Sequence, residues 1–184
     1  MDYVTGSLAL NQFNIISYCQ RPFKTAAEMN SKLIDNINRV VKSTDHLIIL
    51  GDFVFAPLDN DISVKVVRDF RNRINCNKIS LIVGNQDSRM ASDFTFRKLF
   101  LRVENYLEYI TESQVSLILF HYRIATSWNR MNNNSYQLHA HLHGRNLEDD
   151  EDNQLDCSVD SANILLGDYR PFSVEEIVKI CNKS

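Results

Sequence analysis

Two histidines, His141 and His143, are the residues of this chain whose type and spacing most clearly indicate chemistry. They lie in residues 137–144, a segment with three histidines in five positions. On an extended segment, residues i and i+2 project to the same face, so the two imidazoles could close on one metal ion or on two adjacent ions. A lone histidine is usually solvated or hydrogen-bonded within a core, but this density favours metal binding. The partners that we expect for the pair are Asp52, Asn85 and His121.

Each of these partners follows a predicted buried strand. Three continuous apolar runs are typical of strands that are covered on both faces. They are residues 47–50 before Gly51-Asp52, residues 79–83 before Gly84-Asn85, and residues 115–120 before His121. Open α/β sheets bind their ligands at the carboxyl ends of strands, so the three polar residues are expected to meet there.

Two helices and a short strand complete an α/β pattern. Thr25 and Glu28 form a predicted capping box, which starts a helix whose apolar residues recur with a helical period. That apolar stripe consists of Met29, Leu33, Ile37, Val40 and Val41. A second helix is expected over residues 62–74 and an opening strand over 3–5. With 184 residues, 44% of them hydrophobic, and no repeat or linker, the chain is expected to form one domain, residues 1–184.

Charge and composition exclude several classes of function. The net charge is −3 and the pI about 5.9, so a general duplex nucleic-acid surface is not expected. No apolar run is long enough to span a bilayer, and the amino-terminal residues lack a signal-peptide pattern. Four widely spaced cysteines without a CxxC pair predict free thiols in a reducing cytoplasm. We therefore expect a cytoplasmic protein without a membrane partner.

Glycine use points to the same site. The chain has only five glycines, and four of them, Gly6, Gly51, Gly84 and Gly144, lie beside candidate site residues. Glycine lets the backbone turn sharply and approach a ligand closely. Ordinary strand-end turns would explain each glycine alone but not their shared context.

In this order and spacing, the segments resemble the motifs of calcineurin-like metallophosphoesterases, in their small single-domain bacterial and phage form. The matching segments are 14–23 after the first motif, Gly51-Asp52, Gly84-Asn85-Gln86-Asp87, Phe120-His121-Tyr122, Ala140-His141-Leu142-His143, and 168–177 as a closing strand and helix. The resemblance implies a β-sandwich of two sheets flanked by helices, with the site at the carboxyl ends of strands.

The resemblance also implies phosphoester hydrolysis by two adjacent divalent metal ions that share a bridging hydroxide. Asp52 would bridge the two ions, and His143 would belong to the first. The second ion would be held by Asn85, His121 and His141. Mixed carboxylate, amide and imidazole ligands suit Mn²⁺, Fe²⁺ or Zn²⁺.

The chain departs from the family pattern on one half of this site. Ser7 stands where the family has a carboxylate, Ala9 where it has an imidazole, and Gln12 where a further histidine is common. In the third motif, Gln86, next to Asp87, replaces the histidine that assists the leaving group. Glutamine can donate a hydrogen bond but cannot deliver a proton. We therefore expect one divalent metal ion per chain, and the sequence assigns no catalytic residue with assurance.

Two functions follow from this pattern. The first is a degenerate metallophosphoesterase domain that binds a phosphorylated small molecule or a protein partner, with two-metal hydrolysis weakened or lost. Single catalytic losses commonly cost about 10²–10⁴-fold in rate, and here several coincide. The alternative is an active single-metal or rewired phosphoesterase acting on phosphomonoesters, phosphodiesters or cyclic nucleotides. The sequence leaves open which of the two is correct, and also the oligomeric state.

Several other polar residues have weaker indications. Arg21, Arg123 and Arg145 flank motif segments and are expected to contact phosphate oxygens, although a surface salt bridge would equally explain Arg123. His139 is expected to be structural or to lie behind the metal ligands, and His46 to be structural. The acidic run 148–152 is interpreted as a solvated loop or a contact for a basic partner, and residues 132–134 as a turn.

Overall fold

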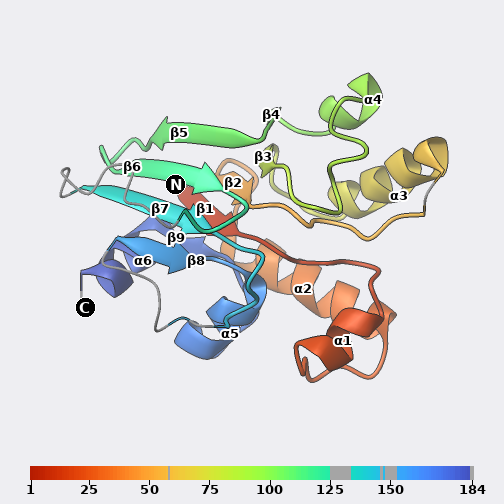
Figure 1. The fold of residues 1–184 in the computed structure, drawn as a ribbon, viewed down its shortest axis with the longest axis horizontal. Helices are drawn as coiled ribbons and strands as arrows, with labels where there is room; N and C mark the ends of the chain where they lie inside the picture. Colours follow the sequence, from red (N-terminus) through yellow and green to blue (C-terminus); the bar gives the residue numbers. More distant parts are fainter. Residues whose placement is uncertain (58, 125–133, 146, 148–152, 183–184) are drawn as a thin grey trace.

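The computed structural model describes residues 1–57, 59–124, 134–145, 147 and 153–182 (Figure 1). Two β-sheets form its centre. The five-stranded sheet contains, in spatial order, β4 (Arg102–Glu104), β3 (Lys78–Ile82), β2 (His46–Ile49), β1 (Asp2–Thr5) and β9 (Phe172–Ser173). The four-stranded sheet contains β5 (Tyr106–Ile110), β6 (Ser116–Phe120), β7 (Ser135–His139) and β8 (Gln154–Asp156).

Helices flank the two sheets. They are α1 (Asn14–Tyr18), α2 (Ala26–Val40), α3 (Asn60–Asn72), α4 (Phe94–Arg97), α5 (Val159–Leu166) and α6 (Val174–Cys181). In Figure 1 the strands lie between α1 to α4 on the right and α6 on the left. This confirms the predicted α/β class with two sheets flanked by helices. The opening strand, the three apolar strands and the two predicted helices also appear, with bounds shifted by at most two residues, and the closing strand and helix expected over 168–177 lie four residues later, at 172–181.

Both sheets are mixed. In the first, β1 to β4 run parallel and β9 pairs antiparallel with β1. In the second, β6 to β8 run parallel and β5 pairs antiparallel with β6. Neighbouring parallel strands end at the same edge of a sheet. The loops after β1, β2 and β3 therefore begin side by side, which is the condition for a shared site.

The core explains why the predicted strands are continuous apolar runs. Alternate residues of β2 point to opposite faces of the sheet. Leu47 and Ile49 belong to one buried cluster, which includes Met29, Leu33 and other residues of α2. Ile48 belongs to a second cluster, which lies between the two sheets. That second cluster also contains Val4, Ile82, Leu117, Leu119 and Leu138. Because both faces of the sheet are covered, no polar alternation is visible in the sequence.

Local signals at the helix ends agree with the structure. The Thr25 side chain caps α2 by accepting a hydrogen bond from Glu28 N at 3.1 Å, as predicted. The Glu28 carboxylate accepts from Lys24 N instead of Thr25 N, so the reciprocal half of the capping box is displaced by one residue. At α6, Ser173 and Glu176 form the complete box.

His46 has the structural role that the sequence predicted. Its Nδ1 lies 3.0 Å from Asp2 Oδ1 and its Nε2 lies 2.8 Å from Ser80 Oγ, so the imidazole links three neighbouring strands. Ser80 is fully buried. This Ser-His-Asp chain therefore has no exposed nucleophile and serves as a polar tie across the sheet.

The remaining general expectations have the following outcomes. The four cysteines are free, with Cys19 half-buried and the other three buried. Among the described residues, the helices are too short or too polar to cross a bilayer. The acidic run 148–152 and residues 132–133 of the predicted turn lie outside the described residues.

Candidate functional site

A cavity of about 300 Å³ opens where the loops after the parallel strands meet. Five residues predicted for the site line it: Asp52, Asn85, Gln86, His141 and His143. The other lining residues come from the loop after β1 and from α1: Ala9, Gln12, Asn14, Ile15 and Tyr18. The lining also includes Ala9 and Gln12, which, like Gln86, depart from the motifs that the sequence resembles.

Three of the predicted metal ligands converge in space. We call Asp52, His121 and His141 the His141 group. Each of the three offers one ligand atom, and these atoms all lie within 4.8 Å of one another. Asp52 Oδ2 is 3.6 Å from His121 Nε2, and the centroids of the two imidazole rings are 5.1 Å apart. The His141 group could therefore hold a metal ion.

His121 presents an unshared electron pair to this group. Its Nδ1 lies 2.7 Å from the carbonyl oxygen of Leu50, and because a carbonyl can only accept, Nδ1 carries the proton. Burial lowers the pKa of His121, which favours the neutral ring with its lone pair on Nε2. That Nε2 is buried and has no hydrogen-bond partner among the described residues. A ring nitrogen fixed by a backbone carbonyl on its far side is the usual arrangement of a metal-binding histidine.

The backbone at Asp52 explains why glycines surround it. Asp52 itself has φ 52° and Gly51 has φ 78°, both in the left-handed region. A Cβ at Gly84 would lie 2.6 Å from Asp52 Oδ1 and 2.9 Å from His121 Cε1. A Cβ at Gly51 would lie 2.5 Å from His121 Nδ1. The two glycines therefore allow the strand ends to approach closely enough to bring Asp52 and His121 together.

Asp87 holds this loop and does not reach the cavity. It is 1% exposed, and its carboxylate accepts from three backbone groups: Asp52 N at 2.7 Å, Gly84 N at 3.0 Å and Phe53 N at 3.2 Å. Burial raises the pKa of Asp87 to about 6, although these donors act in the opposite direction. Of Gln86 and Asp87, neither of which the sequence assigns to catalysis with assurance, only Gln86 lines the cavity, and Asp87 is a positioning residue.

Gln86 contacts the His141 group directly, whereas Asn85 is linked to it through Tyr122. Gln86 donates from its backbone N to Asp52 Oδ1 at 2.8 Å, which leaves Oδ2 directed toward His121. Asn85 Oδ1 accepts from the Tyr122 hydroxyl at 2.8 Å. The Tyr122 ring also lies 4.9 Å from the ring of His141, centroid to centroid. An amide oxygen has two lone pairs, so Asn85 keeps one for a ligand.

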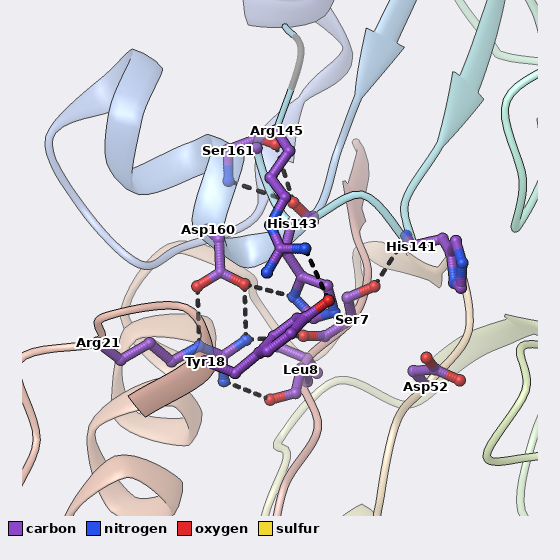
Figure 2. Close-up of polar contacts among 12 residues, drawn as sticks. Ser7, Leu8, Tyr18, Arg21, Asp52, His141, His143, Arg145, Asp160 and Ser161 are labelled. Atoms are coloured by element: carbon purple, nitrogen blue, oxygen red, sulfur yellow. Dashed lines mark hydrogen bonds and ion pairs between the residues drawn. The ribbon is translucent and has the colours of Figure 1, made fainter. Parts of the chain in front are cut away.

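A second cluster lies beside the first and has a different character (Figure 2). We call Cys19, His143 and Asp160 the His143 group; one ligand atom from each lies within 4.8 Å of the others. His143 Nδ1 donates to Asp160 Oδ2 at 2.7 Å. Asp160 was not identified from the sequence. A signal was present, because Ser158 before an apolar run and Gly167 after it mark α5, with Asp160 in its first turn.

Arg21 occupies the His143 group from within the protein. Its Nε and Nη2 donate to the two oxygens of Asp160, both at 2.8 Å. Its remaining N–H groups point to Ser7 O at 2.9 Å, Leu8 O at 2.9 Å and Met29 Sδ at 3.3 Å. The side chain is fully buried. The expected phosphate contact from Arg21 therefore finds no support, since its five donors are already engaged inside the fold.

The electrostatics of the His143 group also disfavour a metal ion. Burial acts to raise the pKa of Asp160, but hydrogen bonds from His143 and Arg21 prevail and lower it. Burial, with the charge of Asp160, raises the pKa of Cys19 to about 12, so this thiol does not offer a thiolate. Any ion here would also face the Arg21 guanidinium. The His141 group is therefore the better candidate metal site.

The histidine pair is not arranged as the sequence suggested. Strand β7 ends at His139, and both later histidines have left-handed backbones, with φ 64° at His141 and 56° at His143. The expected extended segment is therefore wrong at these positions, and the two rings enter different groups. Both nevertheless line the one cavity. His139 is fully buried within β7, in agreement with the structural role expected for it.

Ser7 and Ala9, where a carboxylate and an imidazole would stand in the motif that the sequence resembles, have an unusual backbone. Ser7 has φ 49° and Ala9 has φ 50°, a conformation that costs a non-glycine residue about 1–2 kcal/mol. Ser7 Oγ accepts from His141 N at 3.0 Å, and Ala9 N donates to Asp52 O at 2.8 Å. These residues therefore support the loops of the His141 group without supplying a strong ligand.

The other two arginines lie at the margins. Arg145 is exposed; its guanidinium carbon lies 4.0 Å from the centroid of the Tyr18 ring, and its Nη1 donates to the Tyr18 hydroxyl at 2.6 Å. Arg123 donates from Nε to Gln154 Oε1 at 3.2 Å. Among the described residues, neither lines the cavity directly, and Arg145 borders it through Tyr18.

Comparisons with known proteins give relatives of the whole chain. The chain is 30% identical over 186 residues to the uncharacterized protein MJ1445 of Methanocaldococcus jannaschii, covering 98% of this chain and 91% of that protein. No family model matches the sequence. The crystal structure of AQ665 from Aquifex aeolicus, described as a protein of unknown function, superposes with a TM-score of 0.69 over 98% of both chains. At 20% identity, that similarity shows a shared fold.

Proposed function

We infer, for a chain that belongs to the family of the Methanocaldococcus jannaschii protein MJ1445, that the His141 group binds one divalent metal ion and through it a phosphorylated ligand. The site resembles one half of a calcineurin-like metallophosphoesterase centre. Two-metal phosphoester hydrolysis is, on this proposal, weakened or lost.

One observation carries the proposal: the unpartnered Nε2 of His121. A buried ring nitrogen without a hydrogen bond costs free energy, about 1–3 kcal/mol, unless another group uses its lone pair. Here Asp52 Oδ2 and an imidazole nitrogen of His141 lie within reach of the same point. One carboxylate and two imidazoles suit Mn²⁺, Fe²⁺ or Zn²⁺, and Asn85 is placed to add an amide oxygen. Such an ion, when bound, supplies positive charge for phosphoryl oxygens and lowers the pKa of a bound water.

The surroundings of the group explain why we expect weak hydrolysis. Ser7 Oγ is engaged with His141 N, and Ala9 contributes only a methyl group to the cavity. Gln86 can orient a ligand oxygen but cannot protonate a leaving group. Arg21 already fills the His143 group with an internal cation. The residues that would hold a second ion are therefore absent or occupied.

The cavity favours a small ligand over a protein surface. A volume of about 300 Å³ lies at the lower end of the range for small-molecule sites. A small phosphate ester could enter it entirely, whereas a phosphorylated protein could present only one side chain.

An active single-metal phosphoesterase is a second candidate, favoured by the position of His143. Its ring lines the same cavity as Asp52, and its Nδ1 is fixed by Asp160. In the neutral ring, the other nitrogen could accept a proton from a water molecule in the cavity. The ring would then carry the proton that a leaving group needs and that Gln86 cannot deliver.

The proposal is tested by calorimetric titration of the purified metal-free chain with Mn²⁺, followed by inorganic phosphate. We expect one equivalent of Mn²⁺ to bind, phosphate to bind only in its presence, and Asp52→Asn to abolish both. A panel of phosphomonoesters, phosphodiesters and cyclic nucleotides then separates the two candidates: turnover that disappears in Asp52→Asn would establish the second. Absence of metal binding, or two tight equivalents with rapid turnover, would contradict the proposal.

A further inference from the structure

The cavity wall outside the His141 group is rich in neutral hydrogen-bonding side chains. Four carboxamides line it: Gln12, Asn14, Asn85 and Gln86. Among the described residues, no lysine or arginine contributes to this lining. A site for a ligand with several phosphates normally carries arginine or lysine side chains for them. The wall therefore suits a ligand with a single phosphate, at the metal, and a neutral polar group elsewhere.

Tyr18 adds an aromatic surface to the same wall. It ends α1, where Asn14 lies one helical turn earlier on the same face. The Tyr18 side chain is 60% exposed although it lines the cavity. Two neighbouring side chains nevertheless hold this exposed ring in place.

Contacts on two sides fix the Tyr18 ring, as Figure 2 shows. The Arg145 guanidinium lies over it at 4.0 Å and donates to its hydroxyl at 2.6 Å. The ring of His143 meets it nearly at right angles, at 87° and 6.4 Å between centroids. The ring is thus oriented in advance beside His143, in the cavity that Asp52 and His141 also line, and a ligand that contacts it need not order it.

We propose that the phosphorylated ligand is a nucleoside monophosphate, with its phosphate at the His141 group and its base on Tyr18. This rests on the proposed metal and phosphate site. Base–aromatic stacking tolerates any base, because every base has a π face. A carboxamide carries both a donor and an acceptor, which matches the mixed edge of a nucleobase. Gln12 and Asn14, which line the cavity together with Tyr18, would form hydrogen bonds with that edge.

The test compares ligands that differ by one part, using the full chain loaded with Mn²⁺ and isothermal titration calorimetry. The ligands are adenosine 5′-monophosphate, ribose 5-phosphate, inorganic phosphate and adenosine 5′-triphosphate. We expect the monophosphate to bind about five- to a hundredfold more tightly than ribose 5-phosphate, which is the range that stacking supplies. We expect no gain in affinity for the triphosphate, since none of the described residues that line the cavity carries a positive charge for further phosphates.

Variants of Tyr18 test whether its ring causes the preference for adenosine 5′-monophosphate over ribose 5-phosphate. Tyr18→Leu should reduce the affinity for adenosine 5′-monophosphate to that for ribose 5-phosphate and leave phosphate binding unchanged. Tyr18→Phe should keep most of the preference, because it keeps the ring. Phe13→Leu is the matched control, since Phe13 is 61% exposed next to α1 and does not line the cavity. It should change nothing.

The outcomes separate this inference from the metal site. Equal affinity for adenosine 5′-monophosphate and ribose 5-phosphate, with phosphate binding intact, would overturn the nucleobase while leaving the proposed function standing. Equal weakening of phosphate and nucleotide by Tyr18→Leu would overturn it too. Adenosine binding that depends on Tyr18 in the metal-free chain would support the base site even if no metal bound.

Discussion

The His141 group and the His143 group lie side by side and consist of similar residues, yet they differ in what completes them. Each combines a buried carboxylate with imidazole. In the His143 group, both oxygens of Asp160 are taken by Arg21 and one also by His143. In the His141 group, Asp52 accepts one backbone hydrogen bond, and His121 Nε2 has no partner among the residues described.

This difference teaches how a polar cluster in a fold becomes structural or functional. A buried carboxylate needs either several hydrogen-bond donors, as Asp87 has, or a partner of opposite charge. Where the chain supplies a cation, as Arg21 does for Asp160, we expect the cluster to hold loops together and to have little affinity for an external cation. Where a buried polar atom has no partner among the described residues, as at His121 Nε2, we expect a bound ion to complete the cluster. Residues of both groups, His141 and His143, line the same cavity.

The largest effect, on the free energy of unfolding, is expected when Arg21, the internal partner of Asp160, is replaced. Arg21→Met should lower the free energy of unfolding by about 3–5 kcal/mol, because Asp160 would become an unpaired buried charge. Urea denaturation measures it. The matched control is Arg39→Met, whose exposed pair with Asp168 should contribute less than about 1 kcal/mol. Similar losses in the two variants would mean that the His143 group is not held by Arg21.

A smaller effect on stability is expected from a substitution at Asp87, whose carboxylate holds the backbone of Asp52. Asp87→Asn replaces a carboxylate that serves three backbone donors with one acceptor oxygen and an amide that cannot accept. We expect a loss of about 1–3 kcal/mol in stability and about 10–100-fold weaker metal binding. The control Asp93→Asn changes a helix cap that asparagine serves equally well, so stability should be almost unchanged. A stable Asp87→Asn protein with normal metal affinity would show that Asp87 does not position Asp52.

The smallest effect is a difference in pH dependence between the groups. The folded pKa of His121 lies below its ordinary value of 6.5, because burial disfavours the charged ring. The unfolded chain therefore takes up the proton first, and stability should fall as the pH drops below about 6.5. The pKa of Asp160 lies below its ordinary value of 3.8, against the effect of burial, so its contribution should be lost only below about pH 4.

Urea denaturation of the metal-free chain and of His121→Gln from pH 7.5 to 5 measures this slope, and the difference between the two proteins should correspond to at most about one proton. Asp87, whose pKa burial raises to about 6, contributes in the opposite direction over the same range and equally in both proteins. His121→Gln should remove the His121 contribution, since glutamine does not titrate. An unchanged slope in that variant would assign the pH dependence to another group.

Much of the fold and of the His141 group could be predicted from the sequence, for identifiable reasons. The strands before Asp52, Asn85 and His121 are covered on both faces, so each is a short apolar run with a polar residue after it. The parallel strands β2 and β3 end at one sheet edge and bring Asp52 and Asn85 together, whereas His121 follows β6 of the second sheet and reaches them through the packing of the two sheets. Pattern and topology were therefore sufficient for Asp52 and Asn85.

The His143 group could not be predicted in the same way, because its residues are related only by tertiary contacts. Asp160 lies 17 residues after His143 and Arg21 lies 139 residues before Asp160. An arginine after a loop is usually exposed, so its burial depends on a partner that no local pattern names. The left-handed backbones at His141 and His143 could not be predicted either, because neither position is a glycine or asparagine, the residues that usually adopt this conformation. Their divergence is visible only in three dimensions.

The central claim is that the His141 group binds metal and the His143 group does not. Its most direct test is metal stoichiometry and affinity, by mass spectrometry and calorimetry with Mn²⁺, for the original chain, His141→Gln and His143→Gln. We predict one ion per chain, at least about 100-fold weaker binding in His141→Gln, and affinity within about threefold of the original in His143→Gln. Equal weakening in both variants, or two ions in the original chain, would contradict the account.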